Sequence, residues 1–180
     1  ASQVLKKGKQ VVVLVPEIAL TGQIVRRFLR RFGDDVVVMH SQLSQGEKRN
    51  NWLRMQNGTS HICIGARSAV FAAAQSIGLF IVDEAHDSSY KQDEAPRYHA
   101  VAVARQRAAY YGCPVVLGSA TPALADYYRA LQGEYVLVEL KERVGHRPLP
   151  AVQVVDMRDE LARGNYRVVS DALLTLLEET

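Results

Sequence analysis

The sequence predicts an α/β domain built on a parallel sheet with helices on both faces. Short apolar runs rich in Val and Ile alternate with longer amphipathic segments, as they do where each strand is followed by a helix. The runs are continuous rather than alternating, which is typical of strands that are covered on both faces. The 180 residues, 48% of them hydrophobic, are enough to bury one core.

Five strands are expected, over 11–15, 36–39, 61–64, 79–82 and 115–117. Four helices are expected between and after them, over 17–32, 44–57, 97–111 and 122–132. Ser44 and Glu47 have the spacing of a capping box, so they should begin the second helix. The glycines that should end helices in a left-handed conformation are Gly33, Gly58 and Gly112.

Side chains on the expected helices divide into buried and solvated positions. Leu20, Ile24, Phe28 and Phe32 form an apolar stripe, and a solvated face opposite that stripe accounts for Arg26, Arg27, Arg30 and Arg31. Trp52 and Leu53 are expected in the core. Cys63 and Cys113 are too few and too separated for a zinc site, so we expect them to pack as small hydrophobic side chains.

The two ends of the chain resemble interrupted elements. Val4 and Leu5 read as the last turn of a helix, and Ser170 caps a segment that lacks a stop signal, so a fragment truncated at both ends is expected. Before that, 136–140 and 152–156 are expected as two further strands, joined by a loop that contains Arg143, Gly145, His146, Arg147, Pro148 and Pro150.

The bulk composition excludes few functions. The net charge of +3 permits a polyanionic partner without requiring one. No apolar run approaches the length of a bilayer-spanning helix, and the first ten residues lack the apolar segment of a secretory signal. We therefore expect a cytoplasmic protein without a membrane partner.

Paired carboxylates follow directly after the apolar run that ends at residue 82. Ligands of open α/β sheets collect at the carboxyl ends of such strands. There Asp83 would hold Mg²⁺ through water and Glu84 would act as the base that polarises the attacking water, with His86 beside them. The alternative is a solvated acidic turn.

Two other turns at the same edge suit a nucleic-acid backbone. Pro16 opens a helix whose free amides can hold a phosphate, with Thr21 adding a hydroxyl. The turn after 61–64 supplies Arg67 and Ser68. Taken singly, the first is equally well an ordinary strand-to-helix turn, and an arginine such as Arg67 is more often a structural ion-pair partner. Two phosphate-ready turns at the same edge as the paired carboxylates favour the nucleic-acid interpretation.

The turn after 115–117 carries small hydroxyls. Ser119 or Thr121 can hydrogen-bond His86 and so couple the hydrolytic site to whatever binds beyond it. The alternative role for Thr121, followed by Pro122, is to cap a helix.

The polar loop over 87–99 interleaves aromatic and basic side chains, which is typical of platforms for single-stranded nucleic acid. The expected DNA contacts there are Tyr90, Lys91, Arg97 and Tyr98.

Together these motifs resemble the first lobe of a superfamily 2 helicase. More narrowly, the segments VPEIALT, MHSQLS, GARSAVF, DSSYKQDEAPRYH and LGSATPAL resemble the PriA family of replication-restart helicases over most of residues 9–170. The resemblance implies a RecA-like fold of the P-loop NTPase type, with 1–169 as the lobe and 170–180 as the start of the connection to the second lobe.

It also implies an ATP-dependent 3′ to 5′ DNA helicase of stalled forks, with ATP and Mg²⁺ as cofactors. The implied partners are forked and single-stranded DNA, single-stranded DNA-binding protein and other primosome proteins. The family's zinc-binding cysteines would lie beyond residue 180. The chain differs from the family pattern at Ala85, Val101 and Ala102, and the 180 residues contain no phosphate loop with its lysine, so this chain alone is not expected to hydrolyse ATP. The alternatives are another superfamily 2 motor, such as an RNA helicase, and a catalytically silent binding module.

Overall fold

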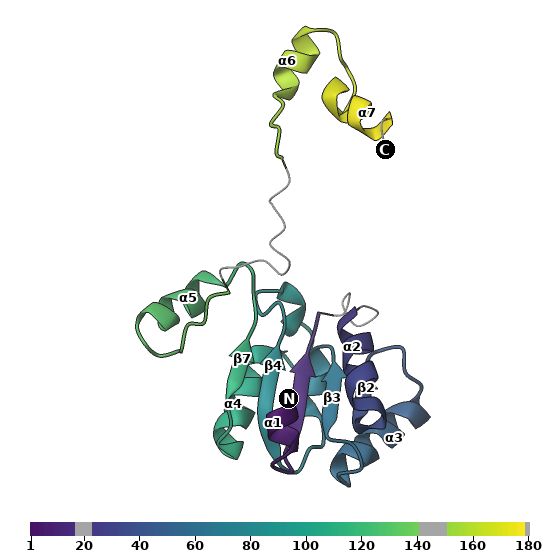
Figure 1. Cartoon of the computed structure of the whole chain (residues 1–180), viewed down its shortest axis with the longest axis vertical. Coiled ribbons are helices and arrows are strands. Elements are labelled where there is room, and N and C mark those ends of the chain that lie inside the picture. Colours follow the sequence, from purple (N-terminus) through teal and green to yellow (C-terminus); the bar gives the residue numbers. More distant parts are fainter. Residues whose placement is uncertain (17–22, 141–150, 179–180) are drawn as a thin grey trace. The chain divides into compact units, whose positions relative to one another are not determined.

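The computed structural model describes residues 1–16, 23–140 and 151–178 (Figure 1). The chain divides into two compact units, Ala1–Leu137 and Val138–Thr180, and each is described by itself. Thr21 and the first turn of the expected helix over 17–32 lie outside the described residues.

The first unit is built on a five-stranded parallel sheet. Its strands lie in the order β2, β3, β1, β4, β7, and their bounds are β1 Gln10–Leu14, β2 Val36–Met39, β3 Ile62–Gly65, β4 Ile77–Val82 and β7 Val115–Leu117. Three helices lie between strands, α2 Gln23–Phe32, α3 Gln45–Gln56 and α4 Ala100–Tyr111, while α1 Ser2–Leu5 precedes β1 and α5 Leu124–Leu131 follows β7. The expected parallel α/β sheet is confirmed.

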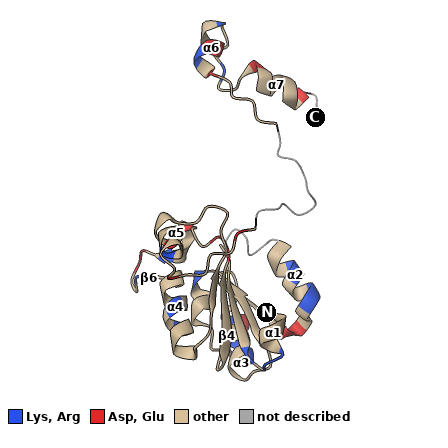
Figure 2. Ribbon diagram, turned by 60° about the vertical axis from the view of Figure 1, so that its left-hand side comes forward, with Lys and Arg blue, Asp and Glu red and all other residues tan. Residues whose placement is uncertain are grey.

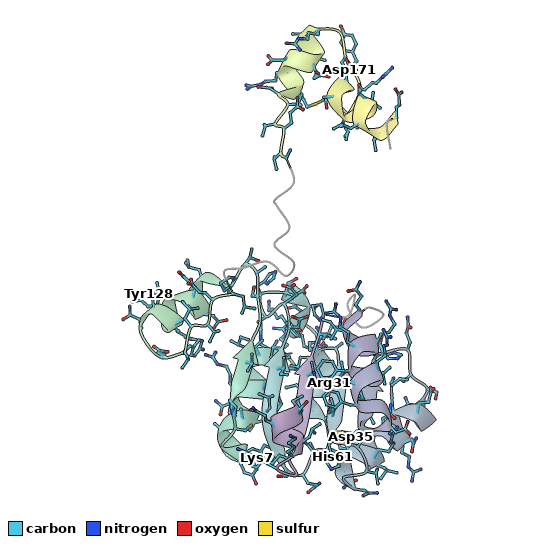
Figure 3. All side chains as sticks on the ribbon, viewed as in Figure 1. Lys7, Arg31, Asp35, His61, Tyr128 and Asp171 are labelled. Atoms are coloured by element: carbon cyan, nitrogen blue, oxygen red, sulfur yellow. The ribbon has the colours of Figure 1, made fainter. Side chains whose placement is uncertain are left out.

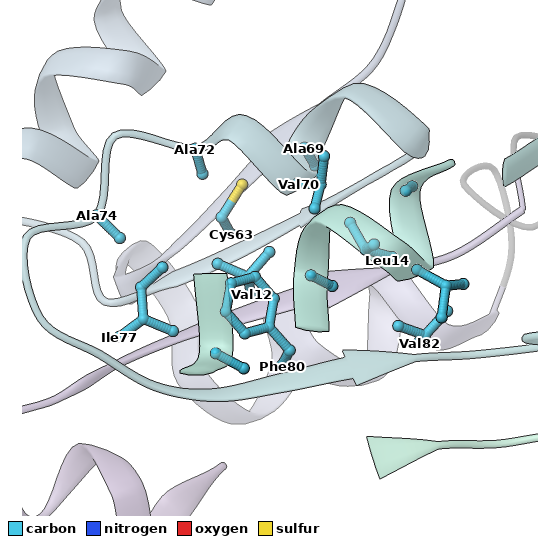
Figure 4. Close-up of a cluster of buried hydrophobic side chains, with 14 of the residues drawn as sticks. Val12, Leu14, Cys63, Ala69, Val70, Ala72, Ala74, Ile77, Phe80 and Val82 are labelled. Carbon is cyan, nitrogen blue, oxygen red and sulfur yellow. The ribbon is translucent and has the colours of Figure 1, made fainter. Parts of the chain in front are cut away.

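The two faces of the sheet bury separate apolar clusters. Val12, Cys63 and Phe80 belong to the cluster that Met55 of α3 and the alanines of α4 cover (Figure 4). Val13 and Ile64 point to the other face, against Val25 of α2 and the side chains of α1. Successive strand residues point to opposite faces, so continuous apolar runs fill both clusters, and helices on both faces are confirmed.

Local signals set most of the helix ends. The Glu47 amide donates to Ser44 Oγ at 3.3 Å and the Ser44 amide donates to Glu47 Oε2 at 2.9 Å, which is the expected capping box. Gly112 ends α4 with a φ of 60°, in the left-handed region. The arginines of α2 lie on its exposed side, as expected, and Figure 2 shows the blue of basic residues along the ribbon of this helix.

The expected start of one helix was wrong, and so was the expected burial of two side chains on another. The helix expected from residue 97 begins at Ala100, because Tyr98–His99 (β6) pairs antiparallel with Lys91–Gln92 (β5). Trp52 and Leu53 are not core residues: their exposed fractions are 44% and 40%, because Met55 is the side chain by which α3 enters the core.

The strands expected over 136–140 and 152–156 do not form either. Both segments lack regular structure, and their valines are mostly exposed, with Val136 at 90% and Val154 at 91%. Neither segment has a pairing partner among the described residues, so the β propensity of Val is not enough to make a strand.

An aspartate and a histidine at the amino ends of two neighbouring strands serve the fold. Asp35 precedes β2 and His61 precedes β3, and His61 Nδ1 lies 2.6 Å from Asp35 Oδ1 (Figure 3). The same carboxylate oxygen accepts the His61 amide at 2.9 Å. These contacts join the two strands at the edge away from the paired carboxylates.

The second unit contains two short helices, α6 Met157–Ala162 and α7 Asp171–Glu178. Ser170 accepts the Leu173 amide at 3.2 Å, so the expected cap at this serine is present. Glu160 Oε2 accepts the Asp171 amide and the Asn165 side chain, both at 2.8 Å, which joins the two helices. No helix in the three described ranges is both long and apolar enough to cross a membrane.

Candidate nucleotide and nucleic-acid site

Backbone hydrogen bonds extend the sheet beyond the carboxyl ends of its strands. The Asp83 amide donates to the Leu14 carbonyl at 2.9 Å, and the Gly118 amide donates to the Val82 carbonyl at 2.8 Å. The Ala85 amide then returns to the Gly118 carbonyl at 2.9 Å. The acidic turn after β4 and the hydroxyl-bearing turn after β7 are thus held side by side.

The two carboxylates of the acidic turn differ in environment. Asp83 is half-buried, and within the described part of the chain its carboxylate has no hydrogen-bond or ion-pair partner. A Cβ built on Gly118 would lie 3.6 Å from Asp83 Oδ1, so the glycine leaves space beside that oxygen. Glu84 is exposed and has a φ of 44°, a left-handed conformation that costs a non-glycine residue about 1 to 3 kcal/mol and that is found most often at functional sites.

A serine hydroxyl connects the acidic turn to the turn after β7. His86 Nδ1 lies 2.7 Å from Ser119 Oγ and 3.6 Å from Glu84 Oε2. Ser119 Oγ also accepts the Thr121 amide at 3.0 Å. The expected contact between His86 and this turn is present. Thr121 does not cap α5, whose N-cap is Ala123, and it enters the network through its backbone.

Tyr90 occupies a different position from the one expected. Its side chain is fully buried and its hydroxyl donates to the Asp83 carbonyl at 2.6 Å, so it offers no surface to DNA in this structure. Burial raises the pKa of the Tyr90 hydroxyl, and the charges of Asp83, Asp87 and Glu84 raise that pKa further. The tyrosine is therefore a stable proton donor that ties the loop over 87–99 to the backbone of the acidic turn.

Arg67 holds the same loop from the other side. Its guanidinium donates to the Ser89 carbonyl at 3.1 Å and to the Lys91 carbonyl. Asp87 Oδ1 accepts the Ser89 amide at 2.7 Å, and this bond holds the pKa of Asp87 below its ordinary value. Arg67 therefore has the structural role that its sequence context also allowed.

The loop leaves the other expected contacts accessible. Lys91 is exposed and pairs with Asp93 at 2.9 Å, while exposed Arg97 donates from Nε to the Asp93 carbonyl at 3.0 Å. Tyr98 is half-buried and packs edge-on against Phe71, with 5.0 Å between the ring centroids. The loop thus presents two cations and one ring edge beside the acidic turn.

A groove of about 660 Å³ lies between this loop and α3. Arg67, Ser68 and Tyr98 line one part of it, and the other part is lined by the α3 side chains Gln45, Lys48, Arg49 and Trp52. Reasoning from the sequence missed the α3 residues. The available signal was the single Trp of the sequence on a helix with few other apolar residues, a pattern that favours a binding surface over a core position.

Gly65 allows the floor of this groove to close. A Cβ at Gly65 would lie 2.4 Å from the Met39 carbonyl oxygen and 2.6 Å from Ala69 Cβ, closer than packed atoms approach. Only glycine fits where β3 turns into the 3₁₀ helix Arg67–Phe71.

The acidic turn fits a magnesium ion that is held largely through water. No group of three or more His, Cys, Asp or Glu that could hold a metal occurs within the described ranges. Mg²⁺ at nucleotide sites is bound by one or two carboxylates together with waters and substrate phosphates. Asp83, with its unpaired oxygens and the space at Gly118, matches that donor set.

Comparisons with known proteins agree with these motifs. The family model for DEAD/DEAH box helicases matches residues 1–130. The Replication restart protein PriA of Bacillus subtilis (strain 168) is 54% identical over 99% of this chain and 22% of its own length. The protein of the same name from Synechocystis sp. is 50% identical over 97% of this chain and 22% of its own length.

These identities confirm the resemblance to PriA helicases, and the chain spans about a fifth of the length of the curated relatives it matches. Among solved structures, the Pyrococcus furiosus Hef helicase domain is 13% identical and covers 72% of this chain and 26% of its own chain, with a TM-score of 0.45, which is too low to bear on function.

Proposed function

The chain belongs to the DEAD/DEAH box helicase family, and from that premise we propose that its parent protein is an ATP-dependent DNA helicase of the PriA type, acting in replication restart. One observation carries the proposal: the buried Tyr90 hydroxyl binds the Asp83 carbonyl at 2.6 Å. A rigid hydrogen bond therefore joins the loop suited to single strands to the turn suited to nucleotide hydrolysis.

The proposal assigns a hydrolytic role to each residue of the acidic turn. Asp83 would hold Mg²⁺ through water, and the bound ion would neutralise charge on the phosphates of ATP. Glu84, exposed and held at a φ of 44°, orients the attacking water and accepts its proton. His86 lies between Glu84 and Ser119 and so senses whether the turn after β7 has moved.

The DNA-facing roles are assigned to side chains around the same edge. Lys91, Arg97 and Tyr98 of the loop contact a single strand, and Ser68 and Arg67 lie where its backbone passes. Thr21, outside the described residues, retains the phosphate-binding role that its turn suggested. Movement of the loop reaches Asp83 through Tyr90, which gives DNA a route to the hydrolytic turn.

The remaining features of the proposal are those that the resemblance to the PriA family implies. We propose forked and single-stranded DNA as substrates, 3′ to 5′ polarity, and single-stranded DNA-binding protein and primosome proteins as partners in the bacterial cytoplasm. Zinc would be bound by residues of the parent outside this chain, and 1–169 would be the first lobe with 170–180 leading to the second.

ATP hydrolysis by the full-length parent tests this function, measured without nucleic acid, with forked DNA and with a matched forked RNA. Strong stimulation by DNA alone is the expected result. Equal or greater stimulation by RNA would indicate a different superfamily 2 motor. Fork binding without any stimulated hydrolysis would indicate a catalytically silent module.

A further inference from the structure

The groove between α3 and the loop carries a positive charge that the proposed hydrolytic site does not use. Its cations are Lys48, Arg49 and Arg67, and no Asp or Glu is among the described residues that line it. Arg67 is engaged with the loop backbone, so the charge available to a ligand comes from Lys48 and Arg49. A groove of about 660 Å³ lies within the size range of small-ligand sites.

The α3 residues reach the groove because of their spacing. Gln45, Lys48, Arg49 and Trp52 stand three, four and seven residues apart, which places them on one face of the helix. Met55 stands three residues after Trp52, so it continues the same side of α3 into the core, and Asn51, four residues before Met55, donates to the Val38 carbonyl at 3.0 Å. One side of the helix therefore lines the groove with its first two turns and enters the core at Met55 in its last turn.

The side chains, rather than the helix terminus, supply the positive charge. Glu47 Oε2 accepts the Ser44 amide at 2.9 Å and the Ser44 hydroxyl at 2.7 Å, so a carboxylate already occupies the N-terminus of α3. Lys48 Nζ donates to the Ser41 carbonyl at 3.1 Å, which fixes the ammonium at the groove and leaves two of its protons free for an anion.

Trp52 gives the groove an aromatic wall. Its side chain is 44% exposed, and within the described residues it makes no ring contact of the kind that Phe71 and Tyr98 make. A half-exposed indole beside cations suits a nucleobase, because every base has a face that stacks on an aromatic ring. Tyr98 lies in the lining of the same groove, on the loop that reaches Asp83.

We propose that this groove takes one nucleotide of the bound DNA strand, with its base on Trp52 and its phosphate on Lys48 and Arg49. The proposal rests on the proposed function and adds to it a base-stacking position. That position is on α3, which is separate in sequence from both the acidic turn and the loop over 87–99. The exposed indole, together with a described lining that holds no Asp or Glu, favours a nucleotide over a peptide.

Photo-crosslinking in the full-length parent tests this placement without altering the protein. An oligo-dT carrying iododeoxyuridine should crosslink to Trp52, and trypsin should then release the adduct on residues 50–54, between Arg49 and Arg54. Adducts that occur only elsewhere in the parent would overturn the proposal.

Binding of a fluorescent oligo-dT to variants of the parent gives the energetics. Trp52→Ala should weaken binding about 5- to 150-fold, the equivalent of about 1 to 3 kcal/mol of stacking, and Trp52→Phe should restore most of the affinity. Leu53→Ala is the matched control, since Leu53 is 40% exposed on the same helix and does not line the groove. It should bind like the wild type.

The salt dependence separates the phosphate contacts from stacking. Lys48→Gln and Arg49→Gln should each lower the slope of log affinity against log salt by about 0.7, whereas Arg30→Gln on α2 should not change it. If the groove variants bind DNA with wild-type affinity and wild-type salt dependence, and their DNA-stimulated hydrolysis is intact, the nucleotide site in the groove is overturned. The proposed function would then still stand. Loss of poly-Glu peptide binding in Trp52→Ala, with DNA binding unchanged, would reassign the groove to a peptide.

Discussion

Replacing Tyr90 by Phe removes one hydroxyl and leaves the buried ring in place. That hydroxyl donates to the Asp83 carbonyl at 2.6 Å, and the tyrosine is fully buried. The substitution therefore leaves a partly buried carbonyl without this partner, which costs about 1 kcal/mol of unfolding free energy. For a chain of this length, the melting temperature should fall by about 2 to 4 °C for each kcal/mol.

Urea titration of the 180-residue chain, followed by circular dichroism, measures this loss. Tyr110→Phe is the matched control because Tyr110 is 84% exposed, and it should change the unfolding free energy by no more than about 0.5 kcal/mol. In the full-length parent, Tyr90→Phe should reduce DNA-stimulated ATP hydrolysis more than basal hydrolysis. Equal stability of the two variants, or an unchanged stimulation ratio, would refute the role given to this hydrogen bond.

Three further results are expected. Gly65→Ala should destabilise the chain by about 1 to 3 kcal/mol in the same titration, because the new methyl group would overlap the Met39 carbonyl; an unchanged midpoint would contradict this. Tyr98→Ala should lower DNA-stimulated hydrolysis in the parent more than basal hydrolysis. Equal loss of both would show that the loop has a structural role and does not contact DNA. Burial raises the pKa of the Cys63 thiol from 9.0 to about 12. Because the folded state holds this proton more tightly than the unfolded state, the stability that the neutral thiol contributes is complete below pH 9 and is lost as pH rises toward 12. The urea midpoint of the wild type should therefore fall between pH 9 and pH 12, and that of Cys63→Ala should fall less. An equal fall of the two midpoints would contradict this role for the thiol.

The strands were predictable because burial on both faces leaves a continuous apolar run. The largest discrepancy is at β4, which begins at Ile77, two residues before the expected start. Gly78 interrupted the run, and the reason for that glycine is tertiary: a Cβ there would lie 2.6 Å from Val4 Cγ1 of α1. The acidic turn and its contact with Ser119 were predictable for the same reason as the strands, since parallel strands end at one edge.

The aromatic residues of the site were harder to place. Tyr90 stands in a polar loop and suggested exposure, yet its hydroxyl finds the Asp83 carbonyl and its ring is buried. Trp52 suggested burial, yet Met55 is the α3 residue that enters the core. Which face of a helix or loop is covered depends on elements distant in sequence, and local pattern does not contain that information. The valines of 136–140 failed as a strand for the same reason, since a strand needs a partner.

The most direct test of the acidic turn as a hydrolytic site is Glu84→Gln in the full-length parent, with ATP hydrolysis and fork binding measured on the same preparation. The substitution keeps the shape of the side chain and removes the base, so DNA-stimulated hydrolysis should fall by about 100-fold or more while fork affinity is unchanged. Glu94→Gln, in the exposed part of the loop, should hydrolyse ATP like the wild type. Retained hydrolysis in Glu84→Gln would contradict the assignment of the acidic turn.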